Sequence, residues 1–154
     1  MDDFTLARTI HVLAVLLWTG GVAFVTLVVM PMLKASAAPD SRLAQFHKIE
    51  SGFAWQARIW VVIAGVSGFW MIWRGDMWSR FIHASYWWMH AMLAVWAIFA
   101  LMLFVIEPLH LHRSMSESAS PAQDFAKLVR MHQLLLALSL ITVFGAVGGS
   151  HGLF

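Results

Sequence analysis

The sequence predicts an all-α integral membrane protein, a four-helix up-down bundle with both termini on the outer side. Of its 154 residues, 60% are hydrophobic and only 12% are charged, which is too little charge for a soluble domain of this size. Four long apolar stretches follow one another, and each reaches the roughly 20 residues that a bilayer needs once its flanking turns are counted. Because a backbone in lipid must satisfy its own hydrogen bonds, we expect these stretches to be helices.

The whole chain, 1–154, is expected to form a single transmembrane domain. Pro31 lies near the end of the first stretch, and Ser41 marks a helix start before an amphipathic lead-in over 42–52. Ser120 and Pro121 mark another helix start ahead of the fourth stretch. The expected spans are 6–33, 53–73, 82–109 and 134–149.

The lysines and arginines favour one orientation. Three arginines lie on the side that holds both termini and the 74–81 loop: Arg8, Arg74 and Arg80. The other side has six basic residues, with Arg58 at its border: Lys34, Arg42, Lys48, Arg113, Lys127 and Arg130. Because loops rich in Lys and Arg stay in the cytoplasm, the two long connectors are expected to face inward and both termini outward. Four tryptophans are expected to anchor the outer boundary: Trp73, Trp78, Trp87 and Trp88.

Composition excludes several kinds of chemistry. The chain has no cysteine, so disulfides, thiolate metal sites and cysteine nucleophiles are ruled out, and eight histidines remain as the main soft ligands, with ten methionines behind them. The net charge is only +2, and the basic residues lie in loops, so they report topology and not nucleic-acid binding. Asp2 and Asp3 stand where a cleavable signal peptide needs basic residues, so none is expected.

His11 and His90 are the leading candidate ligands. Each lies one or two helical turns inside the start of an apolar stretch, the first and the third. Since these two stretches run in the same direction, both imidazoles are expected at one depth on the outer side. An imidazole in hydrocarbon is costly without a partner, and two on facing helices can hold a haem iron from both faces. His132, which begins the fourth stretch, is the candidate ligand for a second site.

Other outer residues are candidates for supporting the same cofactor. His83 lies seven residues before His90, so the two are expected to share a helix face that Ala94 and Ala97 continue. His83 then caps the site or binds a haem propionate, and His151 is a further candidate at the outer end. Arg8, Arg74 and Arg80 are near enough to the outer rim to pair with propionates, although ordinary flanking charge explains them equally well.

Glycines on the second and fourth stretches lie level with these histidines. They are Gly65, Gly68, Gly145, Gly148 and Gly149. Glycine lets a backbone approach a flat macrocycle closely, so two helices can supply ligands while the other two supply room. The alternative is helix packing through small residues, which is common in membranes.

The inner side offers two further sites. Arg58 and Glu107 lie near a membrane boundary and are expected to pair, since either charge alone is costly there. This pair is either structural or part of a proton or quinone site with His132. His110 and His112 are a candidate copper or zinc pair, but residues two apart on a helix diverge, so that site needs an unwound helix end.

The run HVLAVLLWTGGVAFVTLVVMPML resembles the first helix of the copper-resistance D (CopD-like) domain family of small bacterial membrane proteins. The pieces WVVIAGVSGFWMIW and WWMHAMLAVW are similar to the same pattern, which covers nearly the whole chain. The resemblance implies the bacterial inner membrane, and its superfamily includes a haem-associated protoporphyrinogen oxidase with a first-helix histidine that His11 matches. That protein's His-x-Lys reads His90-Ala91-Met92 here, so haem binding is implied while protoporphyrinogen oxidation is disfavoured. Copper transport gains little, because a dense Met-x-x-Met ladder is missing.

The predicted function is a b-type haem-binding electron carrier of the inner membrane, with His11 and His90 as axial ligands. Its expected partners are membrane lipid, a quinone and an outside redox protein, and a second haem would use His132 with His47 or His110. One alternative is a copper-handling protein with histidines and methionines as ligands, and another is a structural subunit without a cofactor. An oxidoreductase activity and a homo-oligomer stay open.

Overall fold

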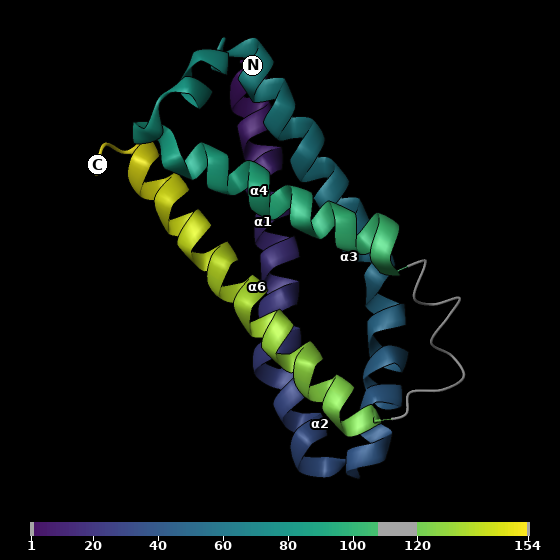
Figure 1. Ribbon diagram of the computed structural model, residues 1–154. Helices are drawn as coiled ribbons and strands as arrows, with labels where there is room; N and C mark the ends of the chain where they lie inside the picture. Colours follow the sequence, from purple (N-terminus) through teal and green to yellow (C-terminus); the bar gives the residue numbers. More distant parts are fainter. Residues whose placement is uncertain (1, 108–119, 154) are drawn as a thin grey trace.

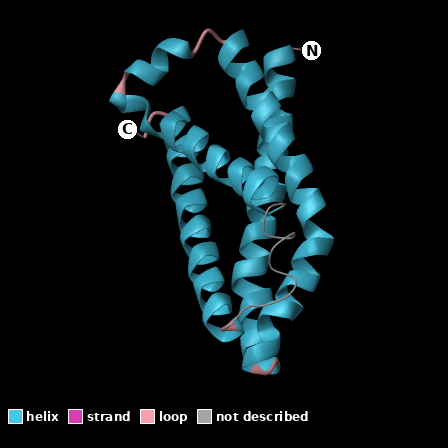
Figure 2. Ribbon diagram, turned by 45° about the vertical axis from the view of Figure 1, so that its right-hand side comes forward, coloured by secondary structure: helices cyan, strands magenta, loops and turns pink. Residues whose placement is uncertain are grey.

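The computed structural model describes residues 2–107 and 120–153, and this part of the chain is helical apart from short connections (Figures 1 and 2). Its helices agree with the predicted all-α class and with a multi-pass membrane protein. Four of them are long and apolar enough to cross a membrane: Asp3–Ser36, Pro39–Arg74, Ala84–Ile106 and Pro121–Ser150. Most of these helices are longer than the predicted apolar stretches, because the polar residues at their ends continue the same helix.

The first of these helices contains a wider turn before its proline. It consists of α1 (Asp3–Phe24), the π-helical segment η1 (Val25–Val29) and α2 (Met30–Ser36). The N–H of Met30 reaches back five residues to the carbonyl of Val25. Pro31 has no N–H and its ring needs room against the preceding turn, so the π segment lets the helix run through it.

The turn into α3 is closed by an arginine. The Arg42 side chain donates to the carbonyls of Ala37 at 3.1 Å and Lys34 at 2.9 Å, which satisfies the end of α2. Ser41 precedes α3 as predicted, but its hydroxyl donates to the Ala38 carbonyl at 3.0 Å and makes no capping bond to α3. The predicted lead-in over 42–52 is continuous with α3 (Arg42–Arg74), whose 33 residues span about 50 Å.

The third apolar stretch begins later than predicted. Residues 75–86 form two short 3₁₀ turns, η3 (Trp78–Ile82) and η4 (Ala84–Tyr86), before α4 (Trp87–Leu101). A second π-helical segment, η5 (Met102–Ile106), follows α4. The predicted end of this stretch at 109 lies outside the described residues.

The last helix, α6 (Pro121–Ser150), begins at the predicted Ser120-Pro121 signal. In Figure 1, α1, α3 and α6 run along the length of the molecule, whereas α4 is inclined to them and ends partway along α3. Both chain ends lie toward the same end of the molecule as the 75–86 connection (Figures 1 and 2). α1 packs mainly against α3, and α4 packs mainly against α6.

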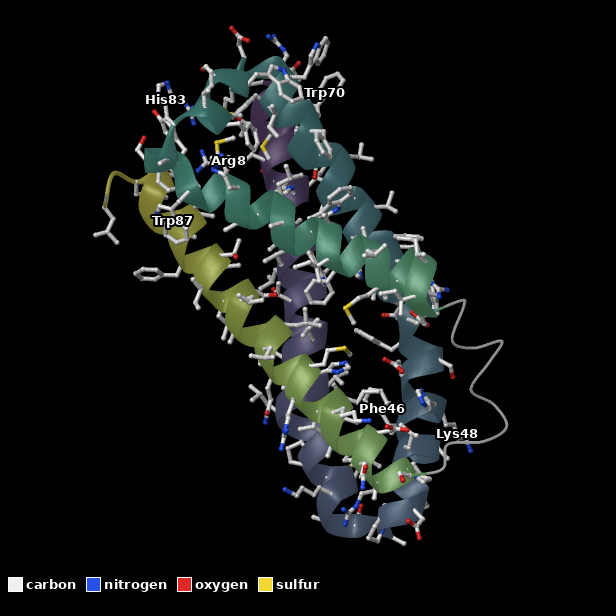
Figure 3. All side chains as sticks on the ribbon, viewed as in Figure 1. Arg8, Phe46, Lys48, Trp70, His83 and Trp87 are labelled. Carbon is white, nitrogen blue, oxygen red and sulfur yellow. The ribbon has the colours of Figure 1, made fainter. Side chains whose placement is uncertain are left out.

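Two clusters of buried side chains hold the helices together. The first joins all four long helices: Ala14, Trp18, Val61, Ala64, Val95, Phe99 and Leu135. The second joins only the first, second and fourth: Val29, Met30, Leu33, Phe46 and Phe125. Phe46 reaches from α3 toward α6, where its ring lies 6.4 Å from that of Phe125 (Figure 3). α4 is shorter than the other three long helices and contributes no residue to this second cluster. No other described helix takes that position.

Many large apolar side chains face outward, while several alanines lie at the closest helix contacts. Leu27 and Val66, for example, are 66% and 67% exposed, whereas Ala14 and Ala64 are 0% and 2% exposed. Lipid solvates apolar side chains, so helices in a membrane associate through close backbone approach and not by hiding their largest apolar groups. The exposed surface is therefore what a bilayer would cover.

Candidate functional site

His11 lies in the interface between α1 and α3. Its Nδ1 donates to the Ala64 carbonyl at 2.8 Å and lies 3.2 Å from the Ser67 hydroxyl. Gly68 lies beside the ring, and a Cβ added there would be 3.1 Å from Cε1 of His11. Since the proton sits on Nδ1, the other nitrogen, Nε2, keeps its lone pair, and it has no hydrogen-bond partner within residues 2–107 and 120–153.

One turn of α3 creates this setting for the imidazole. Ala64 and Ser67 are buried, and Gly68 has no side chain, so α1 approaches closely enough for the ring to reach the backbone. The Ser67 hydroxyl donates to the Ile63 carbonyl at 2.6 Å and so keeps an oxygen lone pair toward His11. A carbonyl that fixes the tautomer of a histidine is the usual outer partner of a metal-ligating imidazole.

His90 lies in a different interface. Its Nε2 donates to the Phe81 carbonyl at 2.9 Å, and its Nδ1 lies 3.3 Å from the Tyr86 carbonyl. The ring is exposed, as are Ala94 and Ala97 further along the same helix. The buried side of α4 carries other residues: Trp88, Met89, Val95 and Phe99. The structure thus places His11 against α3 and His90 against the 75–86 connection, and His90 must release Phe81 to ligate through Nε2.

The prediction that His83 and His90 share a helix face is wrong. His83 joins η3 to η4 with extended backbone angles, φ −108° and ψ 123°, and α4 begins only at Trp87. Helical spacing does not apply across this break, because the chain before α4 is wound into two separate 3₁₀ turns. Figure 3 shows His83 at the outer edge of the molecule, where it is exposed.

Three of the predicted glycines lie against tryptophan rings of α4. Gly65 faces Trp96, whose ring would lie 2.7 Å from an added Cβ, while Gly145 and Gly149 face Trp87 and Trp88. Trp96 is held there because its Nε1 donates to the Val61 carbonyl at 2.9 Å. Indoles fill the space that these three glycines provide, as the alternative of helix packing through small residues predicts. Of Gly65, Gly68, Gly145 and Gly149, only Gly68 faces a histidine. Trp88 is consequently 7% exposed, unlike the other predicted boundary tryptophans.

Two of the outer arginines are engaged by protein groups. The Nε of Arg74 donates to Asp3 Oδ2 at 2.9 Å, which ties the end of α3 to the start of α1. The guanidinium of Arg80 lies 5.2 Å from the centre of the Tyr86 ring. Arg8 projects from α1 toward the start of α4 (Figure 3). The Asp3–Arg74 pair is half exposed, so it contributes little to stability.

The predicted pairing of Arg58 with Glu107 is present. Nη2 of Arg58 lies 3.3 Å from Oε1 of Glu107, and Nε of Arg58 donates to the Leu103 carbonyl at 3.1 Å. In η5 the N–H of Glu107 bonds to Met102, and the next residue in the sequence is a proline without an N–H. The Leu103 carbonyl has therefore lost its helical donors, and Arg58 replaces them.

The remaining histidines do not join this pair. The Nδ1 of His132 donates to the Leu128 carbonyl at 3.0 Å, and its ring lies 5.5 Å from that of Phe46. Within the described residues, no hydrogen bond or ion pair joins His132 to Arg58 or Glu107. His47 pairs with Glu50, and His151 bonds to the Val147 carbonyl at the end of α6. The predicted His110 and His112 pair lies outside the described residues.

Sequence reasoning missed Trp18, which is buried and whose Nε1 has no hydrogen-bond partner in the part of the chain that the structure describes. Its spacing of seven residues from His11 places both on one face of α1, a signal that was available. It also missed the Leu103 carbonyl, because no side-chain pattern marks a backbone group that a π turn leaves unpaired.

The described residues contain no group of three or more His, Asp or Glu side chains placed to hold one metal ion. A haem held by two histidines does not require such a group. Comparison of the chain with protein-family models, with curated proteins and with solved structures finds no match in any of the three. Function is therefore inferred from the side chains, and His11 is the group best prepared to ligate.

Proposed function

We propose that this chain is a four-helix protein of the bacterial inner membrane that binds b-type haem and carries electrons, with His11 and His90 as axial ligands. The observation that carries the proposal is the hydrogen bond from His11 Nδ1 to the Ala64 carbonyl, which presents Nε2 as the ligating atom. When bound, a haem between two histidines supplies a one-electron centre whose potential depends on ligation and burial.

The protein's own groups have distinct tasks in this proposal. Ala64 fixes the His11 tautomer through its carbonyl, and Gly68 leaves the space in which the imidazole sits. His90 takes the second position after exchanging the Phe81 carbonyl for the metal. The resemblance of the first helix to CopD-like proteins supports the same role for His11.

The proposal includes an up-down path across the membrane with both termini outside. The excess of Lys and Arg in the two long connectors supports this orientation. Figure 1 supports only the placement of both termini on one side, because both chain ends lie toward the end of the molecule opposite the 37–41 turn.

A structural membrane subunit without a cofactor is the second candidate. The tryptophans that fill the spaces beside Gly65, Gly145 and Gly149 favour it, because a bundle packed in this way is complete without a macrocycle. In that case the hydrogen bond of His11 serves only to join α1 to α3.

Optical spectra of the purified protein test the proposal. We expect a Soret band and sharp reduced α and β bands, as six-coordinate low-spin haem gives. His11→Ala and His90→Ala should each abolish or convert the low-spin spectrum, because each removes an axial ligand. His47→Ala is the control for the outer site, since His47 is exposed and already pairs with Glu50, and it should leave the bands that depend on His11 and His90 unchanged.

Each other outcome has a definite reading. Unchanged low-spin spectra in both ligand variants contradict the ligand assignment. A colourless protein that contains copper by elemental analysis would replace haem-based electron transfer with copper handling. A protein with neither metal would leave the structural subunit.

A further inference from the structure

The indole N–H of Trp18 is a buried donor without an acceptor. Trp18 is 5% exposed, and among the described residues its Nε1 is the only buried side-chain nitrogen or oxygen that lacks a hydrogen-bond partner. The nearby indole of Trp96, by contrast, donates to the Val61 carbonyl. An unpaired N–H is costly where no water replaces the missing acceptor, and a phenylalanine would fill much of the same space without that cost.

The donor lies where the four long helices meet. Trp18 packs with Val61 of α3, Phe99 of α4 and Leu135 of α6, in a cluster that contains no charged side chain. It follows His11 by seven residues on the same face of α1, about 10 Å further along the helix. The Trp18 indole therefore lies in the interior of the bundle, further along α1 than the His11 site.

We infer that Trp18 donates this hydrogen bond to a carbonyl oxygen of a quinone headgroup. A carboxylate or phosphate does not suit the cluster, because a buried charge needs a counter-charge. A neutral carbonyl needs only one donor, and a lipid-soluble molecule can reach the interior from the bilayer. Phe99 stands edge-on to Trp18, with ring centres 4.8 Å apart, so a headgroup that reaches the N–H has to pack beside this aromatic pair and needs neighbouring side chains to move.

The surrounding side chains can make room for such a ring. Met102 and Met131 pack against the cluster, and methionine side chains change conformation easily. The inference rests on the proposed function only in making the quinone the electron partner of the haem. Binding of the quinone itself does not require haem.

Titration of decylubiquinone into the protein in quinone-free lipid nanodiscs tests the inference. We expect saturable binding by calorimetry, and about tenfold weaker binding by Trp18→Phe, as the loss of one hydrogen bond gives. Replacing Trp18 with benzothienylalanine, which keeps the ring shape and lacks the N–H, should weaken binding equally. Trp96→Phe is the matched control and should bind as the wild type does, because its N–H is already used.

Infrared spectra of ¹³C-carbonyl quinone supply the specific signature. The carbonyl stretch should lie lower in the wild type than in either Trp18 variant. No binding by the wild type, or equal affinity and equal stretch with benzothienylalanine, would overturn the inference. Weaker binding of haem but not of iron octaethylporphyrin by these variants would assign the donor to a haem propionate and overturn the quinone.

Repeating the titration in His11→Ala separates the two proposals. If the protein contains no haem but binds quinone in the Trp18-dependent way, the proposed function fails and the inference stands. If haem binds as proposed while quinone binding ignores Trp18, only the inference fails.

Discussion

Gly20 and Gly65 both lie within long helices, but the space beside their Cα atoms differs. Apart from its own helix turn, no atom of the described residues lies within 4 Å of a Cβ added at Gly20, whereas one added at Gly65 would lie 2.7 Å from the Trp96 ring. That ring is held by its bond to Val61, so it cannot move away freely. The same methyl group therefore meets open space at one position and a fixed indole at the other.

We expect opposite effects of Gly20→Ala and Gly65→Ala on the free energy of unfolding in detergent. Gly20→Ala should raise it by about 0.5–1 kcal/mol, because alanine favours the helix. Gly65→Ala should lower it by about 1–3 kcal/mol, because the packed interface must shift. Urea or thermal unfolding followed by circular dichroism measures both, and stabilisation by Gly65→Ala would contradict the packing described.

The sequence points to candidate ligands but not to the groups that surround them. Two histidines near helix starts were evident, but their partners depend on which face of each helix is buried. Within the apolar stretches both the buried and the exposed faces carry mostly apolar side chains, so composition does not mark the buried face, as the exposed His90 shows. Gly68 was identified from its position level with His11, and the Ala64 carbonyl was not, because a backbone acceptor leaves no trace in the sequence.

At the scale of elements, Arg58 joins α3 to the end of α4. It donates to the Leu103 carbonyl and also pairs with Glu107. The sequence predicted the ion pair from its two charges, but not the backbone bond, which exists because a π turn and a proline leave that carbonyl without a helical donor. The 42–52 segment was predicted to lie outside the second span, but the structure shows one continuous helix. Polar residues do not interrupt a helix that continues beyond the hydrocarbon.

Removing Arg58 should therefore cost more than neutralising Glu107. We expect Arg58→Met to lower the free energy of unfolding by about 2–3 kcal/mol, because both the carboxylate and the carbonyl lose their donor. Glu107→Gln should cost about 1 kcal/mol or less, because the amide oxygen still accepts from Arg58 and the Leu103 bond remains. Equal losses in the two variants, measured by thermal unfolding, would show that the ion pair alone joins the helices.

At the scale of the whole molecule, length and hydropathy were sufficient to predict four helices. A bilayer demands apolar helices of fixed minimum length, so this part of the fold is stated almost directly in the sequence. The inclination of α4 was not predicted, because tilt follows from packing against neighbours and not from the length of a stretch (Figure 1).

The absence of cysteine makes the proposed orientation easy to test. Single cysteines at Ser79, in the 75–86 connection, and at Ala38, in the 37–41 turn, provide a matched pair of reporters. We expect a membrane-impermeant maleimide to label Ser79→Cys in intact cells and Ala38→Cys only after permeabilisation. Labelling of Ala38→Cys alone in intact cells would invert the orientation.

The two π segments have a genetic consequence. A turn that bonds five residues back holds one residue more than an α-helical turn, so each segment is equivalent to an inserted codon. Losing one codon from η1 would remove that extra residue, restore an ordinary helix and leave the residues after it on nearly the same face. Met30 and Leu33 would still face Phe46, but Pro31 would then meet the preceding turn without its wider spacing, so we expect this codon loss to be accepted only when Pro31 is replaced as well.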